Sequence, residues 1–397
     1  MAVKGVFASD KNIQGTRKGD FASAVLQYDP TGSAPLLALS SGMPSQGAAD
    51  TIITWFEENR ITGRVNITTD IALTTSGTVD DASAVVAGQI YIVEANGEYL
   101  YVESVSGAVI TFSRGFGGTT PVDVDGSGTP VPIQRIGNAH EEGSGKPTSF
   151  ANVGSPIFNY MEIFRNSWDA TGTAKAVEFL TGDVVAKNKR DASTFHAEDI
   201  ERSLLWGKKA IGVQNGKPFR SMDGIITQIT ARQTVSGAVT SESTNTKWSD
   251  LDAFLQAVFS NNIKGKPNER IAFCDNQVLS VIGRIAVLNS VIDLATGDTE
   301  FGLKITKWIT PYGTITLMTH PLMNEMQAFR GALYVLHPGA IQTRYLRMTH
   351  EDKNDSDGTR AGADADFGVF TTEMSVEYRG AKTGGIYTGM STPAAEA

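Results

Sequence analysis

A run of alternating apolar and polar residues, GQIYIVEANGEYLYVESVSGAVITFSRGF at 88–116, predicts a small antiparallel β unit in the first half of the chain. Asn96-Gly97 favours a two-residue type I′ turn, because both turn positions need a positive φ. The predicted strands are Ile90–Glu94, Glu98–Glu103 and, after a Ser106-Gly107 turn, Val109–Ser113. The following PVDVDGSGTPVPIQRI at 121–136 predicts Pro-rich edge segments, where a missing N–H does least harm. We therefore expect a meander or small barrel.

The second half of the chain changes to a mixed pattern. TFHAEDIERSLLWGKKAI predicts a helix over Thr194–Ile211, with acidic residues near its start and lysines near its end. SDLDAFLQAVFSNNI predicts a second helix, capped by Ser249, and a third helix is predicted after Asp275. The apolar stripes of these three helices are Ala197, Ile200, Leu204 and Ile211; Leu251, Phe254, Leu255, Val258 and Phe259; and Val278, Val281, Ile282 and Ile285. The predicted strands are Ile271–Phe273, Lys304–Ile309, Gly313–Met318, Leu333–Leu336 and Thr371–Tyr378. The fold class is therefore α+β.

Length and charge exclude several classes of protein. With 397 residues the chain has room for roughly two to three domains. Its net charge of −9 argues against a protein that grips phosphates over a broad surface. A single cysteine, Cys274, excludes an intrachain disulfide framework and a Cys-rich zinc site, and suits a reducing cytoplasm.

The N-terminal fifty residues show little periodicity, because glycines and prolines interrupt each candidate element. This composition predicts an arm more than a domain. The segment lacks the apolar core of a signal peptide, and no stretch of the chain approaches ~18 apolar residues. We therefore expect a soluble protein that is not exported through a signal peptide.

Three segments have a superficial likeness to ligand-binding loops. EEGSGKP at 141–147 ends like a phosphate-binding loop, but His140 stands at the first glycine position and Pro147 replaces the Ser/Thr. Asp123 and Asp125 resemble the start of a calcium loop, but Gln134 falls at the bidentate position, and a polar turn is the alternative. The acidic stretch Glu351–Asp366 places Lys353 at a ligand position, so we interpret it as a surface loop.

No residue is predicted to be catalytic, to bind a cofactor or to hold a metal. The histidines are His140, His196, His320, His337 and His350, and no two have the spacing of metal ligands on a helix. Cys274 follows an apolar run, which is typical of a buried, inert thiol. Nucleophile elbows, dinucleotide fingerprints and paired carboxylates are absent from suitable contexts.

The segments SPIFNYMEIFRNSWDATGTAKAVEF and AEDIERSLLWGKKA resemble the major capsid (major head) proteins of tailed bacteriophages with the Hong Kong ninety-seven-like fold, siphovirus type. The residues that carry this resemblance are Asn159, Ile163, Phe164, Thr171 to Thr173 and Asp199 to Arg202. NAHEEGSGKP, FGLKITKWITPYGTITLM and FTTEMSVEYRGAKTGGIYTGM resemble later parts of the family in the same order. The resemblance covers most of the chain from about Thr51 onward.

The resemblance implies a division of the chain into an arm, an extended loop with a β-rich insertion, a peripheral domain and an axial domain. The implied parts are an N-terminal arm (1–50), the outgoing strand of the extended loop (51–69), a β-barrel or meander insertion domain (70–147), the returning strand (148–175), the peripheral domain with its spine helix (176–222), the axial domain (223–338) and the C-terminal part of the peripheral domain (339–397).

The implied function is a capsid that self-assembles as hexamers and pentamers into an icosahedral head around double-stranded DNA, within the virion. Scaffold, portal and decoration proteins are the implied partners, without a membrane, and assembly is implied in the bacterial host cytoplasm. The resemblance shows no match to the Lys–Asn isopeptide cross-link of some relatives. Two alternatives are an encapsulin-like compartment shell and a carbohydrate-binding or decoration protein, but the second leaves the helices unexplained.

Overall fold

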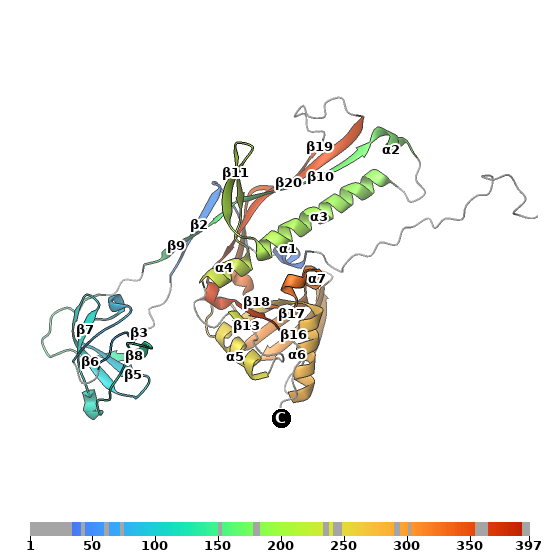
Figure 1. Cartoon of the computed structure of the whole chain (residues 1–397). Coiled ribbons are helices and arrows are strands. Elements are labelled where there is room, and N and C mark those ends of the chain that lie inside the picture. Colours follow the sequence, from blue (N-terminus) through green and yellow to red (C-terminus); the bar gives the residue numbers. More distant parts are fainter. Residues whose placement is uncertain are drawn as a thin grey trace, which may run out of the picture. The chain divides into compact units, whose positions relative to one another are not determined.

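The computed structural model describes two compact units, residues 56–157 and the remainder of the chain (Figure 1). The described residues are 34–40, 44–58, 63–71, 75–149, 153–177, 183–232, 238–240, 248–289, 294–300, 303–353 and 364–390. Among these residues, no helix has the length and apolar character needed to cross a membrane. Helix and strand make up 28% and 42% of the structure, so the predicted α+β class is confirmed.

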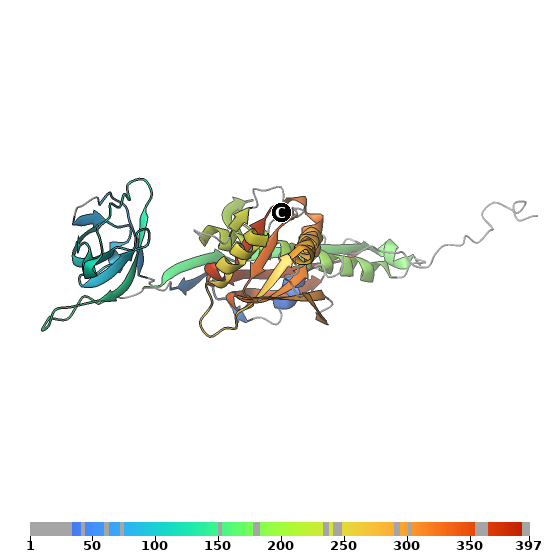
Figure 2. The same ribbon diagram turned by 90° about the horizontal axis from the view of Figure 1, so that it is seen from below.

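The smaller unit is a closed antiparallel barrel, drawn in blue and cyan in Figures 1 and 2. Its strands are β3 (Arg64–Ile67), β4 (Ser76–Thr78), β5 (Gln89–Val93), β6 (Tyr99–Ser106), β7 (Val109–Ser113) and β8 (Val131–Asn138), in the order β3-β8-β5-β6-β7-β4. The two outer strands meet, since Thr68 N donates to Thr78 O (2.9 Å) and Asp80 N to Asn66 O (3.0 Å). Closure leaves no open sheet edge at this seam. Short 3₁₀ turns, η2 (Ala82–Ala84) and η3 (Phe116–Gly118), lie in its loops.

The barrel core follows from the two-residue period of its strands. Tyr91 and Val93 on β5, and Leu100 and Val102 on β6, point inward and are at most 2% exposed. Side chains between them point outward, as a pleated strand requires. The three strands predicted from the alternating pattern are confirmed as β5, β6 and β7, with ends that differ by up to three residues.

The predicted type I′ turn at Asn96-Gly97 is wrong. Gly97 has a φ of 74°, but Asn96 does not have a positive φ. Val93 N donates to Glu98 O (2.8 Å), so four residues lie between the paired positions. The Asn96 side chain instead accepts from Glu98 N (3.0 Å), as in an Asx turn.

Two further expectations for this unit differ from the structure. Strand β8 lies between β3 and β5, so it is an internal strand of the sheet and not a Pro-rich edge. Strand β3, expected within the outgoing strand of an extended loop, pairs with β8 in the barrel. The compact unit accordingly starts before residue 70 and ends after residue 147.

The larger unit contains a four-stranded sheet covered by a long helix. The strands β1 (Ser45–Gly47), β19 (Ile341–Lys353), β20 (Ala365–Tyr378) and β10 (Glu162–Thr171) are adjacent in that order. Helix α3 (Val184–Trp206) runs along β10 and β20, and the short helix α2 (Gly172–Ala176) precedes it (Figure 1). Their core includes Phe164, Ile200, Leu204, Met374 and Val376.

Helix α3 begins ten residues earlier than predicted and ends five residues earlier. Asp183 is its N-cap, with Oδ1 accepting from Val185 N at 2.8 Å. Its first half is polar, so apolar periodicity could not detect it. Ile211, expected on the buried stripe, is 60% exposed on the next strand, whereas Ile200 and Leu204 are buried as predicted.

The region predicted as an arm contains two docked elements. Helix α1 (Pro35–Ser40) begins at a proline, which suits the first helical position, and β1 pairs in parallel with β19. Residues 1–33 lie outside the described residues.

A seven-stranded sheet forms the other part of the larger unit. Its order is β13 (Ala238–Thr240), β21 (Gly385–Thr388), β18 (Leu333–Leu336), β14 (Glu269–Cys274), β17 (Gly313–Thr319), β16 (Leu303–Thr310) and β15 (Leu294–Glu300). Helices α5 (Trp248–Phe259) and α6 (Asn276–Asn289) bury the two predicted stripes against it. Those stripes and the five predicted strands of the second half are confirmed, although Ser249 lies within α5 and does not precede it. Short elements complete the unit: α4 (Ile225–Arg232), α7 (Pro321–Glu325), η4 (Gln327–Phe329), η5 (Pro338–Ala340) and η6 (Ala381–Thr383).

Two strand pairs stand apart from these sheets. Strands β2 (Ile52–Glu57) and β9 (Ser155–Tyr160) pair where the chain passes between the two units. Strands β11 (Ala210–Gln214) and β12 (Lys217–Ser221) form a hairpin directly after α3.

Candidate assembly sites

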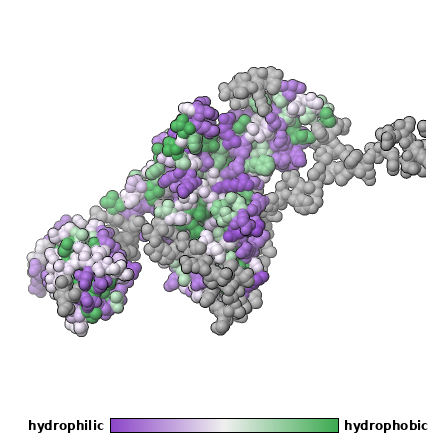
Figure 3. Space-filling model, in the orientation of Figure 1, coloured by the Kyte–Doolittle hydropathy of each residue, from purple (hydrophilic) through white to green (hydrophobic). Residues whose placement is uncertain are grey.

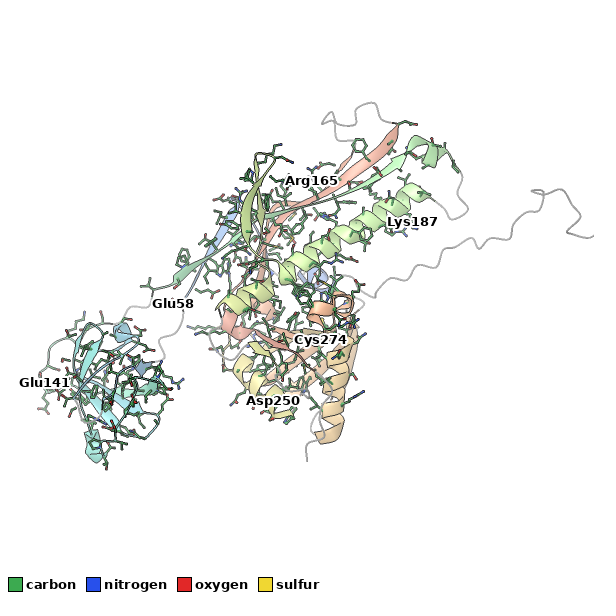
Figure 4. The ribbon with its side chains drawn as sticks, in the orientation of Figure 1. Glu58, Glu141, Arg165, Lys187, Asp250 and Cys274 are labelled. Atoms are coloured by element: carbon green, nitrogen blue, oxygen red, sulfur yellow. The ribbon has the colours of Figure 1, made fainter. Side chains whose placement is uncertain are left out.

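The single cysteine, Cys274, is buried at the end of β14 in the seven-stranded sheet (Figure 4). Burial, assisted by the charge of Asp275, raises the pKa of its thiol to about 12. The thiol is therefore protonated at neutral pH, as expected for an inert buried cysteine.

The buried histidines are held separately by hydrogen bonds. His196 contacts Asn166 Oδ1 and Thr372 Oγ1, both at 2.7 Å. His320 contacts Glu201 (2.9 Å) and His337 contacts Asn262 (3.0 Å). Within the described part of the chain, no group of three His, Cys, Asp or Glu side chains could hold a metal ion.

The candidate calcium residues form a local turn. Asp125 Oδ1 accepts from Ser127 N (2.9 Å) and Ser127 Oγ (2.5 Å), and these bonds lower the pKa of Asp125. Asp123 and Asp125 are both exposed. This geometry matches the polar-turn alternative.

The two other loop-like segments also have structural explanations. Residues 141–147 are exposed and belong to neither a strand nor a helix. Glu351 was expected in a surface loop but lies in β19. Its carboxylate accepts a hydrogen bond from Trp168 Nε1 (3.1 Å) and forms an ion pair with Lys189 Nζ (2.6 Å). Residues 354–363 of the acidic stretch lie outside the described residues.

Glu201 on α3 holds the short helix α1 through its carboxylate. Its Oε1 accepts from Leu36 N and its Oε2 from Leu37 N, both at 2.7 Å. These are N–H groups of the first helical turn, which have no partner within the helix. His320 binds the same carboxylate, so Glu201 is both buried and satisfied. The structure thus ties a segment near the N-terminus to α3.

Asn159 anchors the strand β9 to the larger unit. Its Nδ2 donates to Asp223 O (3.0 Å) and Val376 O (2.9 Å), and its Oδ1 accepts from Asp223 N (2.8 Å). Gln228 Nε2 donates to the same two carbonyl groups. This buried amide network holds the C-terminal end of β9, at Asn159, against α4 and β20.

The β2–β9 pair also exposes apolar residues. Ile53 and Trp55 are buried, whereas Phe56 and Phe158 are 74% and 43% exposed. Large apolar side chains exposed on an extended strand pair are typical of a surface that is covered by another chain.

The larger unit and the barrel together have the fold of phage capsids. The capsid of cyanophage P-SCSP1u matches with a TM-score of 0.51 and 11% identity, covering 98% of this chain and 97% of the other. The capsid of an empty GTA particle matches with a TM-score of 0.52 and 7% identity, covering 97% and 100%. These likenesses define a protein with the Hong Kong ninety-seven-like capsid fold.

Sequence comparison then gives the family. The major capsid protein of Pseudomonas phage PaMx41 is 27% identical over 403 residues, covering 97% of this chain and 96% of that protein. The model of the SU10 major capsid protein family matches residues 8–391, and the chain belongs to this family. It is the major capsid protein of a phage and a component of the virion, and copies of it form an oligomeric shell. The predicted family resemblance is confirmed.

Sequence reasoning missed the residues that organise these surfaces. Glu201 and Asn159 were noted only within the family-like segments, because nothing in their local sequence signals burial. The hairpin β11–β12 had a readable signal, since Asn215-Gly216 is the same dipeptide as at 96–97. Both of its residues have a positive φ, 51° and 74°, as a type I′ turn requires.

Proposed function

We propose that this major capsid protein self-assembles into an icosahedral head shell that encloses the double-stranded DNA genome of a tailed phage. The observation that carries the proposal is the family match over residues 8–391, because it spans both compact units. Exposed apolar side chains on β2, β9 and β11 support it, since a shell subunit buries such surface against its neighbours.

Within such a shell, we assign the parts of the chain by their place in the fold. Residues 1–50 would act as the arm, and β2 with β9 as the paired strands of the extended loop, with the barrel between them. Helix α3 and the four-stranded sheet would form the peripheral domain. The seven-stranded sheet with α5 and α6 would form the axial domain, near the centres of pentamers and hexamers.

The partners follow from this role. Copies of the chain would form hexamers and pentamers in the host cytoplasm, with a scaffold, a portal and decoration proteins as further partners. The net charge of −9 suits a DNA container, because a strongly basic lining would hold packaged DNA by counterion release. We also propose that no residue is catalytic and that neighbours are not joined covalently. Denaturing gels of mature heads should therefore show one band near 42.4 kDa, and a ladder of multimers would contradict this.

Electron microscopy tests the proposal directly. The purified chain, alone or with its scaffold, should form closed icosahedral shells or tubes. A well-behaved monomer in sedimentation under all assembly conditions would refute it. An encapsulin-like compartment is the alternative, and it would be recognised by protein cargo in place of DNA within native particles.

A further inference from the structure

The hairpin β11–β12 exposes apolar residues on both of its faces. Ile211, Val213 and Phe219 are 60%, 72% and 50% exposed. Ile211 pairs with Arg220 and Val213 with Pro218, so these four side chains share one face. Phe219 lies opposite Gly212 on the other face. In Figure 1 the hairpin projects from the strands beside it, and Figure 3 shows hydrophobic and hydrophilic groups side by side on the surface of the larger unit.

The same hairpin is strongly basic. Residues 207–222 contain Lys208, Lys209, Lys217 and Arg220 and no carboxylate. Lys209 is used within the chain, with its Nζ 3.4 Å from Asp223 Oδ2 and 4.4 Å from the Phe158 ring centre. No ion pair is found for the other three in the part of the chain that the structure describes. A two-stranded hairpin with two uncovered faces is marginally stable in water, so a complementary surface would stabilise it.

The acidic complement lies in the barrel sequence. Residues 56–157 carry twelve carboxylates and five basic side chains, a net charge of −7, whereas the whole chain has −9. Glu103, Asp123, Glu141 and Glu142 are all exposed. The barrel also exposes apolar side chains, since Phe116, Val122 and Ile136 are 38%, 44% and 55% exposed. The barrel therefore exposes carboxylates and apolar side chains, which complement the basic and the apolar residues of the hairpin.

We propose that the hairpin β11–β12 docks on a second copy of this chain, against the acidic and apolar surface of that copy's barrel. The inference rests on the proposed function, because identical copies meet in the shell at high local concentration. Charge complementarity would set the orientation of the contact, and the apolar side chains would supply the buried area. Packaged DNA is the less suitable occupant, since Ile211, Val213 and Pro218 gain nothing from phosphate contacts.

Photo-cross-linking of assembled particles tests the contact. The variant Val213→p-benzoylphenylalanine should give a band at the mass of two chains on a denaturing gel. Mass spectrometry should place the attached peptide within 56–157. A product at the mass of one chain, a peptide from the larger unit, a nuclease-sensitive product or no product at all would each overturn the proposal.

Charge reversal provides a second measurement, which does not need the unnatural residue to be tolerated. The variant Lys217→Glu/Arg220→Glu should raise the critical concentration for assembly by at least about tenfold, with thermal unfolding of the unassembled chain unchanged. The matched control Lys217→Arg/Arg220→Lys keeps both charges and should assemble like the native chain. An unchanged critical concentration in the reversed variant would count against the docking. If the native chain itself failed to assemble, the proposed function would fail instead, so the two failures are distinguishable.

Discussion

Glu201 on α3 and His320 before α7 form a hydrogen bond of 2.9 Å, from Nε2 to Oε1, with both side chains fully buried. The same carboxylate receives two backbone N–H groups of α1. One acidic side chain on α3 thus holds α1 and the residue before α7, whose contacting residues lie 165 and 119 residues away from Glu201 in sequence.

The variant Glu201→Gln tests this junction. A glutamine keeps the shape but has one acceptor oxygen, so an N–H group of α1 loses its partner. We expect the free energy of unfolding to fall by about 1–3 kcal/mol, and amide exchange at Leu36 and Leu37 to become faster. Glu198→Gln, which removes a partly exposed partner of Arg202 on the same helix, is the control and should cost less than about 1 kcal/mol. Equal losses from the two variants would contradict the anchor.

His337 should make the stability of the chain pH-dependent. Burial, with the nearby charges of Arg270 and Lys266, lowers its pKa to about 4 from 6.5. The unfolded chain therefore takes up a proton below pH 6.5, while the folded chain resists it. The contribution of His337 to the free energy of unfolding is fully present above pH 6.5. It falls by on the order of 3 kcal/mol as the pH drops to about 4. Urea unfolding over this range should show the slope, and His337→Gln should flatten it; an unchanged slope would mean that another group is responsible.

Glu98 and Arg114 form a bidentate ion pair inside the barrel, with side chains 0% and 6% exposed. Burial acts to raise the pKa of Glu98, but bonds from Arg114, Val122 and Gly115 outweigh it, so the pKa lies below the ordinary 4.5. The stabilisation is present above pH 4.5 and is lost as the pH falls through the lower folded value.

Removing one member, Arg114→Met, should cost about 3–5 kcal/mol at neutral pH, because a buried carboxylate is left unpaired. Arg64→Met breaks the exposed pair with Glu94 on the same barrel and should cost less than about 1 kcal/mol. Thermal unfolding of the two variants gives the comparison. Similar losses of stability in the two variants would show that the buried ion pair contributes no more than the exposed one.

Leu204 faces the core and is 1% exposed. Leu204→Asp should place an unpaired charge among Ile200, Met374 and Val376, cost several kcal/mol and abolish soluble assembly. Phe195→Asp, on the exposed face of the same helix, should leave the unfolding transition of the unassembled chain nearly unchanged. Normal heads formed by Leu204→Asp would disprove the burial of this stripe.

The barrel should be removable. Met161 N donates to Thr51 O (2.9 Å), and Gly154 lies beside Glu57, so the ends of the insert are close together. Replacing residues 58–153 by a short Gly/Ser turn should leave a chain that folds and forms capsomers. Circular dichroism and sedimentation check this, and insoluble chain would show that the larger unit depends on the barrel.

The two Asn-Gly pairs show how far local sequence reaches. At 215–216 the dipeptide forms the type I′ turn, and Gln214 pairs with Lys217 across it. At 96–97 a shift of two residues gives a longer loop, which places Glu98 opposite Val93. Both registers keep the same side chains inside, because a shift of two preserves the alternation. Contacts of Glu98 with Arg114, Gly115 and Val122, which are distant in sequence, favour the observed register.

Apolar periodicity was sufficient where one face of an element is buried along its whole length. The stripes of α5 and α6 were predicted from spacing, and so were five strands of the second half, whereas β13, β15, β19 and β21 were not predicted. The family resemblance of the segments around Asn159 and Asp199 likewise identified the class of protein.

The tertiary structure decided what spacing cannot encode. The first half of α3 has few apolar residues, and it is placed by polar contacts such as Asn188 Nδ2 to Asp169 O (2.6 Å) and Lys189 to Glu351. Buried polar groups such as Glu201 and Asn159 look like surface residues in sequence, because their partners come from segments tens to hundreds of residues away. A hydrogen bond is favourable in the interior only when both groups meet there, and that meeting exists only after the chain has folded.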